Sequence, residues 1–228
     1  CMEKVVVSLG GSVLVPNEDD ARYLADLASL LRRLSSRVRL FAVTGGGRVA
    51  RYYIETGRAL QVSERRLDEL GIGITRMNAR LLGAALKGRS NLEPARTYAE
   101  AARFAKRYPI VLMAGTRPGH TTDRVSASLA RFVGATRIVN ATSVEGVYTA
   151  DPRRDSSARL LERIGFEDLV RLAGEGHHAA GPNVVFDPVA ARVLARDRIP
   201  LSVVRGRDLS SLEAAILGQP FRGTLVSE

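Results

Sequence analysis

The stretch VTGGGRVAR, residues 43–51, contains the only run of three glycines in the sequence, and its pattern indicates the fold class. A short apolar run precedes it, and Arg48 and Arg51 follow the glycines Gly45 to Gly47. Glycine weakens a regular element, so three in a row need a structural reason. The pattern predicts a buried strand, a loop that another group can approach closely, and a helix beginning at that loop. Because N–H groups at a helix start attract anions, we expect a phosphate group at the glycines, with Arg51 one turn behind it.

Outward from this stretch, apolar runs alternate with helical patterns along the whole chain. Strands are predicted at residues 4–9, 38–43, 110–113, 137–140, 201–204 and 224–226, with a short edge piece at 91–94. Helices are predicted at about 48–60, 64–86, 97–107, 122–132, 166–172, 187–196 (capped by Asp187, with Pro188 first) and 210–217; another carries Leu24, Leu27, Leu31 and Leu34 behind a cap at Asp19 or Asp20. Residues 142–157 form a polar, turn-rich segment. Short continuous apolar strands that alternate with helices predict an α/β fold, with a mainly parallel sheet covered on both faces.

The composition limits the class of protein. The 228 residues suit one large α/β domain or two small lobes, and 45% of them are hydrophobic. No apolar run approaches the roughly 20 residues of a membrane span, and the N-terminus lacks the pattern of a signal peptide. Cys1 is the single cysteine, which excludes an intrachain disulfide or a cysteine-built metal site. A cytoplasmic protein is the simplest interpretation.

The formal net charge is +10, and only three of the 34 basic residues are lysines. Arginine binds phosphate with two parallel hydrogen bonds, so the excess fits phosphorylated metabolites or nucleic acid, or merely an arginine-rich genome. Aromatic residues are 5% of the chain and tryptophan is absent, so stacking platforms for single strands are scarce. The arginines are also spread along the chain. Nucleic-acid binding is therefore disfavoured.

Glycine-bearing loops follow three of the predicted strands. They are SLGGS (8–12), VTGGGR (43–48) and MAGTRPGHTTD (113–123). In a parallel sheet, ligands bind where the carboxyl ends of the strands meet, so these loops predict one anion-binding edge. None of them matches the Walker pattern or the G-x-G-x-x-G fingerprint.

Seven stretches occur in the order found in a known family. They are GGSVL (10–14), GGGRVAR (45–51), DELGI (68–72), TRMNA (75–79), GTRPGHTTD (115–123), NATSVEGVYTADP (140–152) and DPVAAR (187–192). In these stretches the chain resembles the amino acid kinase superfamily and, within it, the archaeal-type uridylate (UMP) kinases. The resemblance covers almost the whole chain, and GTRPGHTTD and VEGVYTADP are its most specific parts.

This resemblance implies a single open three-layer αβα sandwich that binds two nucleotides end to end, and an enzyme that phosphorylates UMP with ATP. UMP would lie over residues 1–135 and ATP, carrying Mg²⁺, over residues 136–228. The implied UMP-binding residues are Gly46, Asp68, Thr116, Arg117, Pro118, Gly119, His120, Thr121 and Thr122. The implied ATP-binding residues are Gly11, Ser12, Gly47, Arg51, Thr142, Ser143, Tyr148 and Asp151, of which Gly11, Ser12, Gly47 and Arg51 face the transferred phosphate. Family members are typically hexamers.

One departure concerns the first strand. Many superfamily members carry a lysine there that neutralises the transferring group, and here the position is Ser8. Phosphoryl transfer depends on positioning and charge neutralisation, so Mg²⁺, Arg51 and the loop amides must supply the positive field, with Arg48 as a further candidate. No carboxylate cluster forms a metal cage in the sequence, so Mg²⁺ would arrive with ATP. His120 is expected to have a structural role, because the attacking phosphate oxygen is already anionic.

Other interpretations stay open at this point. The chain could be a kinase for isopentenyl phosphate, acetylglutamate or carbamate, a non-catalytic anion-binding or storage protein on the same fold, or a nucleic-acid-binding protein. Single residues have plain alternatives too: the glycines could serve turns, Arg51 and Asp68 could be solvated, and Tyr148 could pack in the core.

Overall fold

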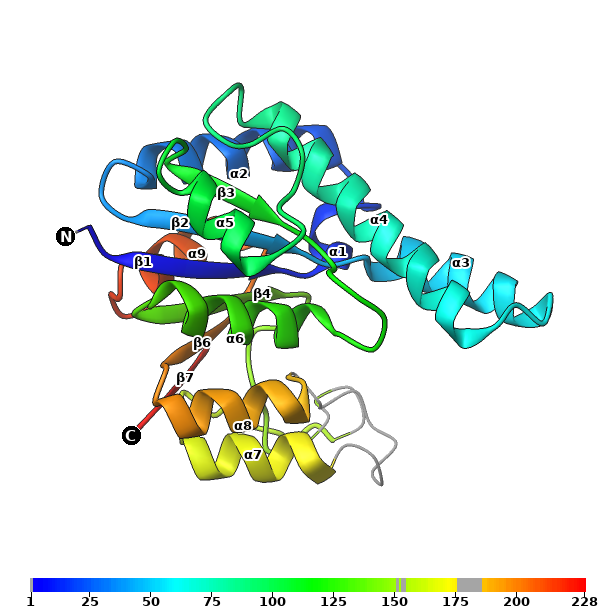
Figure 1. Ribbon diagram of the computed structural model, residues 1–228. Helices are drawn as coiled ribbons and strands as arrows, with labels where there is room; N and C mark the ends of the chain where they lie inside the picture. Colours follow the sequence, from blue (N-terminus) through cyan, green and yellow to red (C-terminus); the bar gives the residue numbers. More distant parts are fainter. Residues whose placement is uncertain (1, 151, 153–154, 176–185) are drawn as a thin grey trace.

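The chain forms one twisted sheet with helices on both faces (Figure 1). The computed structural model describes residues 2–150, 152, 155–175 and 186–228. Within these ranges seven strands pair in the order β3-β2-β1-β4-β6-β7-β5. They are β1 (Lys4–Leu9), β2 (Arg39–Thr44), β3 (Ile110–Met113), β4 (Arg137–Thr142), β5 (Arg163–Gly165), β6 (Leu201–Arg205) and β7 (Thr224–Ser227). Every pair is parallel except β6 with β7, which confirms the predicted mainly parallel sheet.

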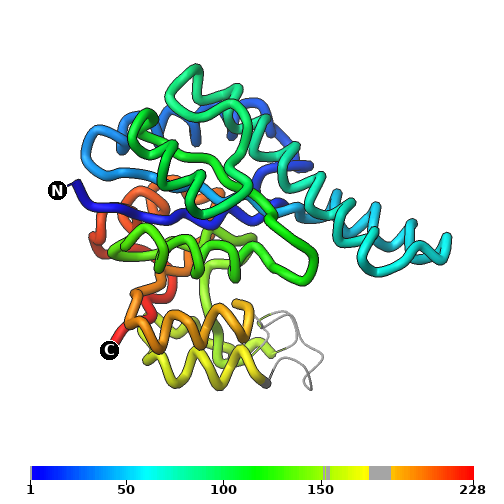
Figure 2. The backbone as a smooth tube through the Cα atoms, in the orientation of Figure 1, coloured from blue at the N-terminus to red at the C-terminus, as the bar shows by residue number. Residues whose placement is uncertain are grey.

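The helices form the outer layers (Figures 1 and 2). They are α1 (Gly11–Leu14), α2 (Asp20–Leu34), α3 (Gly47–Ala59), α4 (Glu64–Ala85), α5 (Tyr98–Phe104), α6 (Thr122–Val133), α7 (Phe166–Glu175), α8 (Pro188–Asp197) and α9 (Leu209–Ile216). One core cluster joins the sheet to α2, α9 and the last turns of α4. A second cluster joins the opposite face to α5, α6, α7 and α8. The expected three-layer αβα sandwich is therefore confirmed.

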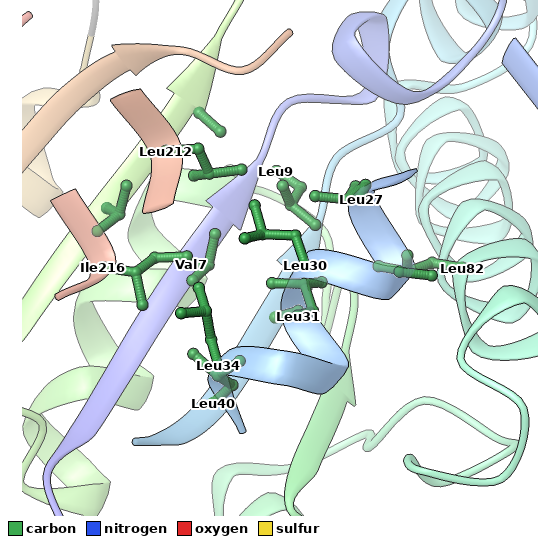
Figure 3. Close-up of a cluster of buried hydrophobic side chains, with 14 of the residues drawn as sticks. Val7, Leu9, Leu27, Leu30, Leu31, Leu34, Leu40, Leu82, Leu212 and Ile216 are labelled. Carbon is green, nitrogen blue, oxygen red and sulfur yellow. The ribbon is translucent and has the colours of Figure 1, made fainter. Parts of the chain in front are cut away.

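The central strand β1 shows why the sheet needs both layers. Val5, Val7 and Leu9 belong to the cluster under α2 and α9, whereas Val6 belongs to the cluster under α6. Figure 3 shows Val7 and Leu9 among the leucines of α2 and α9. Burying each side chain of this size contributes about 1.5–3 kcal/mol to the free energy of unfolding. Side chains alternate between faces along a strand, so a continuous apolar run is stable only when both faces are covered.

Of the two helix caps predicted at aspartates, one was wrong and one is confirmed. Asp19 precedes α2 in the left-handed region, with φ of 56°, and its side chain caps nothing. The carboxylate of Asp20 instead accepts hydrogen bonds from the Asn17 backbone, at 2.8 Å, and from Arg207, at 2.6 Å. The predicted cap at Asp187 is confirmed, since its Oδ1 accepts from the backbone N–H groups of Val189 and Ala190.

Two elements were not anticipated, and one expected piece is irregular. Helix α1 has four residues and β5 has three, too few to show a periodic pattern in sequence. The segment at 91–94 is no strand. Isolated bridges at Ser90 and Ala95 flank it and pair it loosely with the edge strand β3.

Helices α3 and α4 lie side by side and project from the sandwich (Figure 1). Six of the ten exposed large apolar side chains in the described ranges lie on or directly after these helices: Tyr52, Tyr53, Leu60, Leu70, Met77 and Leu81. In the same ranges, no helix combines the length and the apolar composition that crossing a membrane requires.

Candidate active site

The first and second glycine loops touch each other through their backbones. A Cβ atom built on Gly11 would lie 2.3 Å from the carbonyl carbon of Gly46 and 2.3 Å from the nitrogen of Gly47. One built on Gly47 would lie 2.3 Å from the nitrogen of Ser12, and Gly47 has a φ of +62°. No side chain fits at this junction. The backbone of the first glycine loop therefore comes closest to Gly47, whereas a Cβ atom on Gly46 would lie 2.4 Å from the Cβ of Ala50 in α3.

A cavity of about 480 Å³ opens beside this junction, at the carboxyl edge of the sheet. Its lining includes eight of the nine predicted UMP-binding residues: Gly46, Asp68, Arg117, Pro118, Gly119, His120, Thr121 and Thr122. Gly47 and Arg51 line it as well, and Ala50, Ile54 and Ile72 supply apolar surface. Residues that lie far apart in the sequence thus form one concave, mixed polar and apolar site, as expected of a small-molecule pocket.

Asp68 connects α4 to the loop after β3. Its Oδ2 atom accepts a hydrogen bond from the backbone N–H of Gly119 at 2.8 Å. Gly119 has a φ of +77°, a conformation that favours glycine. Asp68 is therefore engaged in the pocket wall and is more than a solvated surface carboxylate.

His120 and Arg117 form a pair in the same loop. The Nε of Arg117 donates to Nε2 of His120 at 2.8 Å. Burial lowers the pKa of His120, and the charges of Arg124 and Arg117 lower it further, so the imidazole is neutral near pH 7. The imidazole is also held within its own loop by Arg117.

Two buried polar atoms of this loop stand out. His120 Nδ1 and the hydroxyl oxygen of Thr116 have no hydrogen-bond partner within the described residues. Buried polar atoms are rarely left unpaired in folded proteins, so both mark a place where another polar group is expected. Thr116 is the one predicted UMP-binding residue outside the cavity lining.

The two arginines of VTGGGRVAR have separate contacts. The guanidinium of Arg51 donates to the hydroxyl of Ser12 at 3.3 Å and lines the cavity. Arg48 instead donates to the carbonyl of Pro16 and, at 3.1 Å, to Oδ1 of Asn17. The structure gives no support for Arg48 as a source of positive charge at the transferred phosphate, because its guanidinium binds the loop after α1.

Ser8, the residue at the usual lysine position, is only 1% exposed. It lies in β1 between Val43 of β2 and Asn140 of β4 in the register of the sheet. An uncharged side chain therefore occupies the centre of the sheet, close to the point where the glycine loops begin.

Three of the predicted ATP-binding residues, Thr142, Ser143 and Tyr148, lie at the carboxyl end of β4 or in the loop that follows it. Thr142 ends the strand, and its carbonyl accepts from the Gly206 N–H at 2.8 Å. The hydroxyl of Tyr148 donates to Glu145 at 3.0 Å, so this half-buried tyrosine contacts the loop itself. Strand β4 also contacts the first glycine loop, because the backbone N–H of Gly10 donates to the carbonyl of Ala141 at 3.0 Å. Thr142, Ser143 and Tyr148 do not line the cavity beside Gly46 and Asp68, and Asp151 lies outside the described residues.

A carboxylate pair behind the β3 loop was missed by sequence reasoning. Oδ2 of Asp123 accepts from the backbone N–H of Asp187 at 3.1 Å, and Oδ2 of Asp187 accepts from the Thr121 hydroxyl at 3.0 Å. Burial raises the pKa of Asp123 to about 7, and the nearby charge of Asp187 acts in the same direction. Both aspartates are visible in the sequence, in TTD (121–123) and DPVAAR (187–192). Local patterns do not show that they meet, because they lie 64 residues apart.

No group of three or more His, Cys, Asp or Glu side chains within the described ranges could hold a metal ion. Any Mg²⁺ at the glycine junction would therefore need most of its ligands from phosphate oxygens and water, which is the usual coordination of Mg²⁺ at nucleotides.

The fold and the cavity define the class: an α/β protein with a small-molecule cavity that is lined by glycine loops and an arginine. The family model of the amino acid kinase family matches residues 3–205. A uridylate kinase of Methanoculleus marisnigri is 45% identical over 227 residues, covering 100% of this chain and 97% of that protein. One of Pyrococcus abyssi is 41% identical, covering 98% and 99%.

Solved structures agree with these sequence matches. The crystal structure of uridylate kinase from Archaeoglobus fulgidus superposes with a TM-score of 0.88 at 38% identity, covering 98% of this chain and 100% of that one. UMP kinase from Bacillus anthracis, at 20% identity and a TM-score of 0.81, shares the fold. The chain belongs to the amino acid kinase family.

Proposed function

We propose that this protein is a uridylate kinase, which transfers the γ-phosphoryl group of ATP to UMP and releases UDP and ADP. The full-length similarity to several uridylate kinases carries this proposal. The acceptor cavity supports it, because Asp68, Arg51 and the β3 loop supply a hydrogen-bond acceptor, a cation and a shaped wall for a nucleoside monophosphate.

In the proposed arrangement, residues 1–135 hold UMP and residues 136–228 hold ATP, within a single domain. The uracil and ribose of UMP would contact the β3 loop and Asp68, and its phosphate would lie near Gly46. ATP would lie over the end of β4, with its phosphates directed toward Gly11, Ser12 and Gly47. The contact between Gly10 and Ala141 supports this order, because it places the end of β4 beside the glycine junction.

The reaction needs little acid–base chemistry from the protein. A phosphate oxygen of UMP forms a bond to the γ-phosphorus, the bond to the β-phosphate oxygen of ATP breaks, and ADP leaves. Bound Mg²⁺, entering with ATP, would neutralise charge on the phosphates. The residues of this chain would align the two nucleotides and hold Arg51 beside the transferring group, where a preorganised donor is most effective.

The decisive experiment is an assay of ADP release with several acceptors. UMP, CMP, isopentenyl phosphate and acetylglutamate are compared with ATP and Mg²⁺, and we expect the highest kcat/KM with UMP. Equal kcat/KM for UMP and CMP would remove the claim about the acceptor. No ADP release with any acceptor would instead favour a non-catalytic anion-binding protein.

We also propose that the protein self-associates, as a homohexamer. The exposed apolar side chains of α3 and α4 support a contact between copies of the chain, because such patches mark protein interfaces. Leu60→Glu should lower the mass measured by sedimentation equilibrium. Leu92→Glu is the matched control, since Leu60 and Leu92 are both 73% exposed and Leu92 lies elsewhere. An unchanged mass in Leu60→Glu would place any interface on another surface.

A cytoplasmic location is also proposed, because ATP and nucleoside monophosphates are found there.

A further inference from the structure

One turn of helix α4 touches both walls of the acceptor cavity. The walls are the β2 loop, residues 44–47, and the β3 loop, residues 114–122. Thr75 and Asn78 lie on this turn, in the motif TRMNA, to which no function has been assigned above. Their side chains contact backbone atoms of different loops, so a single helical turn determines the spacing between the walls.

Thr75 holds the β3 loop. Its hydroxyl oxygen accepts from the backbone N–H of Gly115 at 2.9 Å and donates to the carbonyl of Ile72 at 2.7 Å. A Cβ atom on Gly115 would lie 2.9 Å from this hydroxyl, so the approach requires glycine. The backbone carbonyl of Thr75 also accepts from the hydroxyl of Thr44, at 2.8 Å, which brings the end of β2 to the same residue.

Asn78 holds the β2 loop. It is 5% exposed, and its Nδ2 donates to the carbonyl of Gly45 at 2.8 Å. The nitrogen of Gly45 in turn donates to the carbonyl of Leu9 at 2.8 Å. Gly45 is thus held from two sides, immediately before the glycines that pack against the Gly11–Ser12 backbone. A buried side-chain amide that bonds to a loop carbonyl in this way fixes the loop rather than binding a ligand.

We propose that Thr75 and Asn78 are positioning residues that set the two loops for phosphoryl transfer. The proposal rests on the proposed function. Thr75 lines the acceptor cavity itself and holds the loop expected to bind UMP, so its loss weakens acceptor binding. Asn78 acts on the glycine junction beside Arg51, so its loss misaligns the reacting groups. Their effects therefore differ: the first appears in KM for UMP, and the second in kcat.

The experiment compares shape-matched variants in steady-state kinetics with UMP and ATP varied separately. Thr75→Val should raise KM for UMP about tenfold, the scale of one lost buried hydrogen bond, with KM for ATP unchanged. Thr75→Ser keeps the hydroxyl and should restore KM. Asn78→Ala should lower kcat by about 10²-fold, because small misplacements of reacting groups are costly. Asn78→Asp replaces the donor with an acceptor facing Gly45 O and should be no better than Asn78→Ala.

Thr224→Val is the matched control. Thr224 is fully buried, and its hydroxyl oxygen accepts from the backbone N–H of Val147 at 2.8 Å, so the same kind of bond is lost far from α4. This variant should lose thermal stability much as Thr75→Val does, with KM for UMP unchanged. Equal changes of KM for UMP in both variants would mean general destabilisation and would overturn the proposal.

A second measurement separates this inference from the proposed function. Amide hydrogen exchange of residues 44–47 and 114–122 should accelerate in Asn78→Ala and Thr75→Val, respectively, whether or not UMP is the substrate. Unchanged exchange in these loops would overturn the positioning role. Faster exchange without UMP-dependent ADP release in the wild type would uphold the positioning role and reject the function. If Thr75→Val fails to fold, Thr75→Ala takes its place: exchange of residues 114–122 should accelerate in Thr75→Ala and keep the wild-type rate in Thr75→Ser, and unchanged exchange in Thr75→Ala would overturn the positioning role.

Discussion

The guanidinium of Arg51 lies 3.3 Å from the hydroxyl oxygen of Ser12, so the helices that follow β2 and β1 meet through these two side chains. Both residues lie at the junction where the two glycine loops pack backbone against backbone. A positive charge is thereby held beside the loop amides, in a protein whose central strand carries uncharged Ser8. This arrangement motivates the first two predictions.

Arg51→Ala should lower kcat by about 10²-fold or more, the scale of removing one preorganised donor from a transition state. Arg51→Lys should recover only part of the rate, because an ammonium group cannot bond to two phosphate oxygens in the fixed geometry of a guanidinium. Steady-state kinetics with circular dichroism as a folding check measures both. Arg58→Ala is the control on the same helix, because Arg58 is paired with Glu64 away from the cavity. Normal turnover in Arg51→Ala would contradict the role.

Ser8→Lys, made in the Arg51→Ala background, should restore part of the lost kcat. The reason is that a charge at the end of β1 would supply the positive field that Arg51 provides in the wild type. Ser8→Met in the same background has a side chain of comparable bulk without the charge and should restore nothing. Since Ser8 is 1% exposed, melting temperatures of both double variants must be compared. Equal rates in the two would show that charge is not the missing factor.

Asp68→Ala should weaken UMP binding by roughly 1–3 kcal/mol, because it removes an acceptor from a partly buried polar site. Isothermal titration calorimetry with UMP gives the value directly. Asp68→Asn retains an oxygen that can accept from Gly119 N–H, and should therefore lose less affinity. Glu69→Ala, at a neighbouring exposed carboxylate paired with Arg65, should bind UMP normally. An Asp68→Ala variant with wild-type affinity would exclude a role in the acceptor site.

Asp123 should make stability depend on pH. Burial raises its pKa to about 7 from the ordinary 3.8, so the folded protein binds more protons than the unfolded chain between these values. The contribution of this group to the free energy of unfolding is therefore fully present below the unfolded pKa and is lost as pH rises through about 7.

Asp123→Asn removes this loss, because asparagine stays neutral and still offers an oxygen to the Asp187 N–H. Relative to wild type, the variant should melt at increasingly higher temperature as the pH is raised from about 5 to about 8. Thermal melts followed by circular dichroism across this range provide the test. A melting difference that does not change with pH would mean that Asp123 does not titrate there.

Much of the fold could be predicted from local sequence patterns. Continuous apolar runs such as 4–9 and 110–113 must be buried on both faces, which requires a parallel sheet between two helical layers. Eight of the nine residues that the family resemblance implies for UMP binding line one cavity. Seven of them lie on the loops after β2 and β3, whose carboxyl ends meet at one edge of the sheet, and Asp68 reaches the cavity from α4. The sequence by itself thus determined the layers and the edge of the sheet where the cavity opens, and the resemblance named most of the residues that line it.

Tertiary structure alone decided how the loops are held. Nothing local indicates that Asn78 bonds to Gly45 O, that Thr75 meets Gly115 N–H, or that Arg48 turns to Pro16 while Arg51 reaches Ser12. The Asp123 and Asp187 contact and the bond from Arg207 to Asp20 likewise join distant segments. Local patterns record only whether a side chain is buried. Which backbone group it meets there depends on how whole helices and strands pack, and that packing is set by the summed burial of both core clusters.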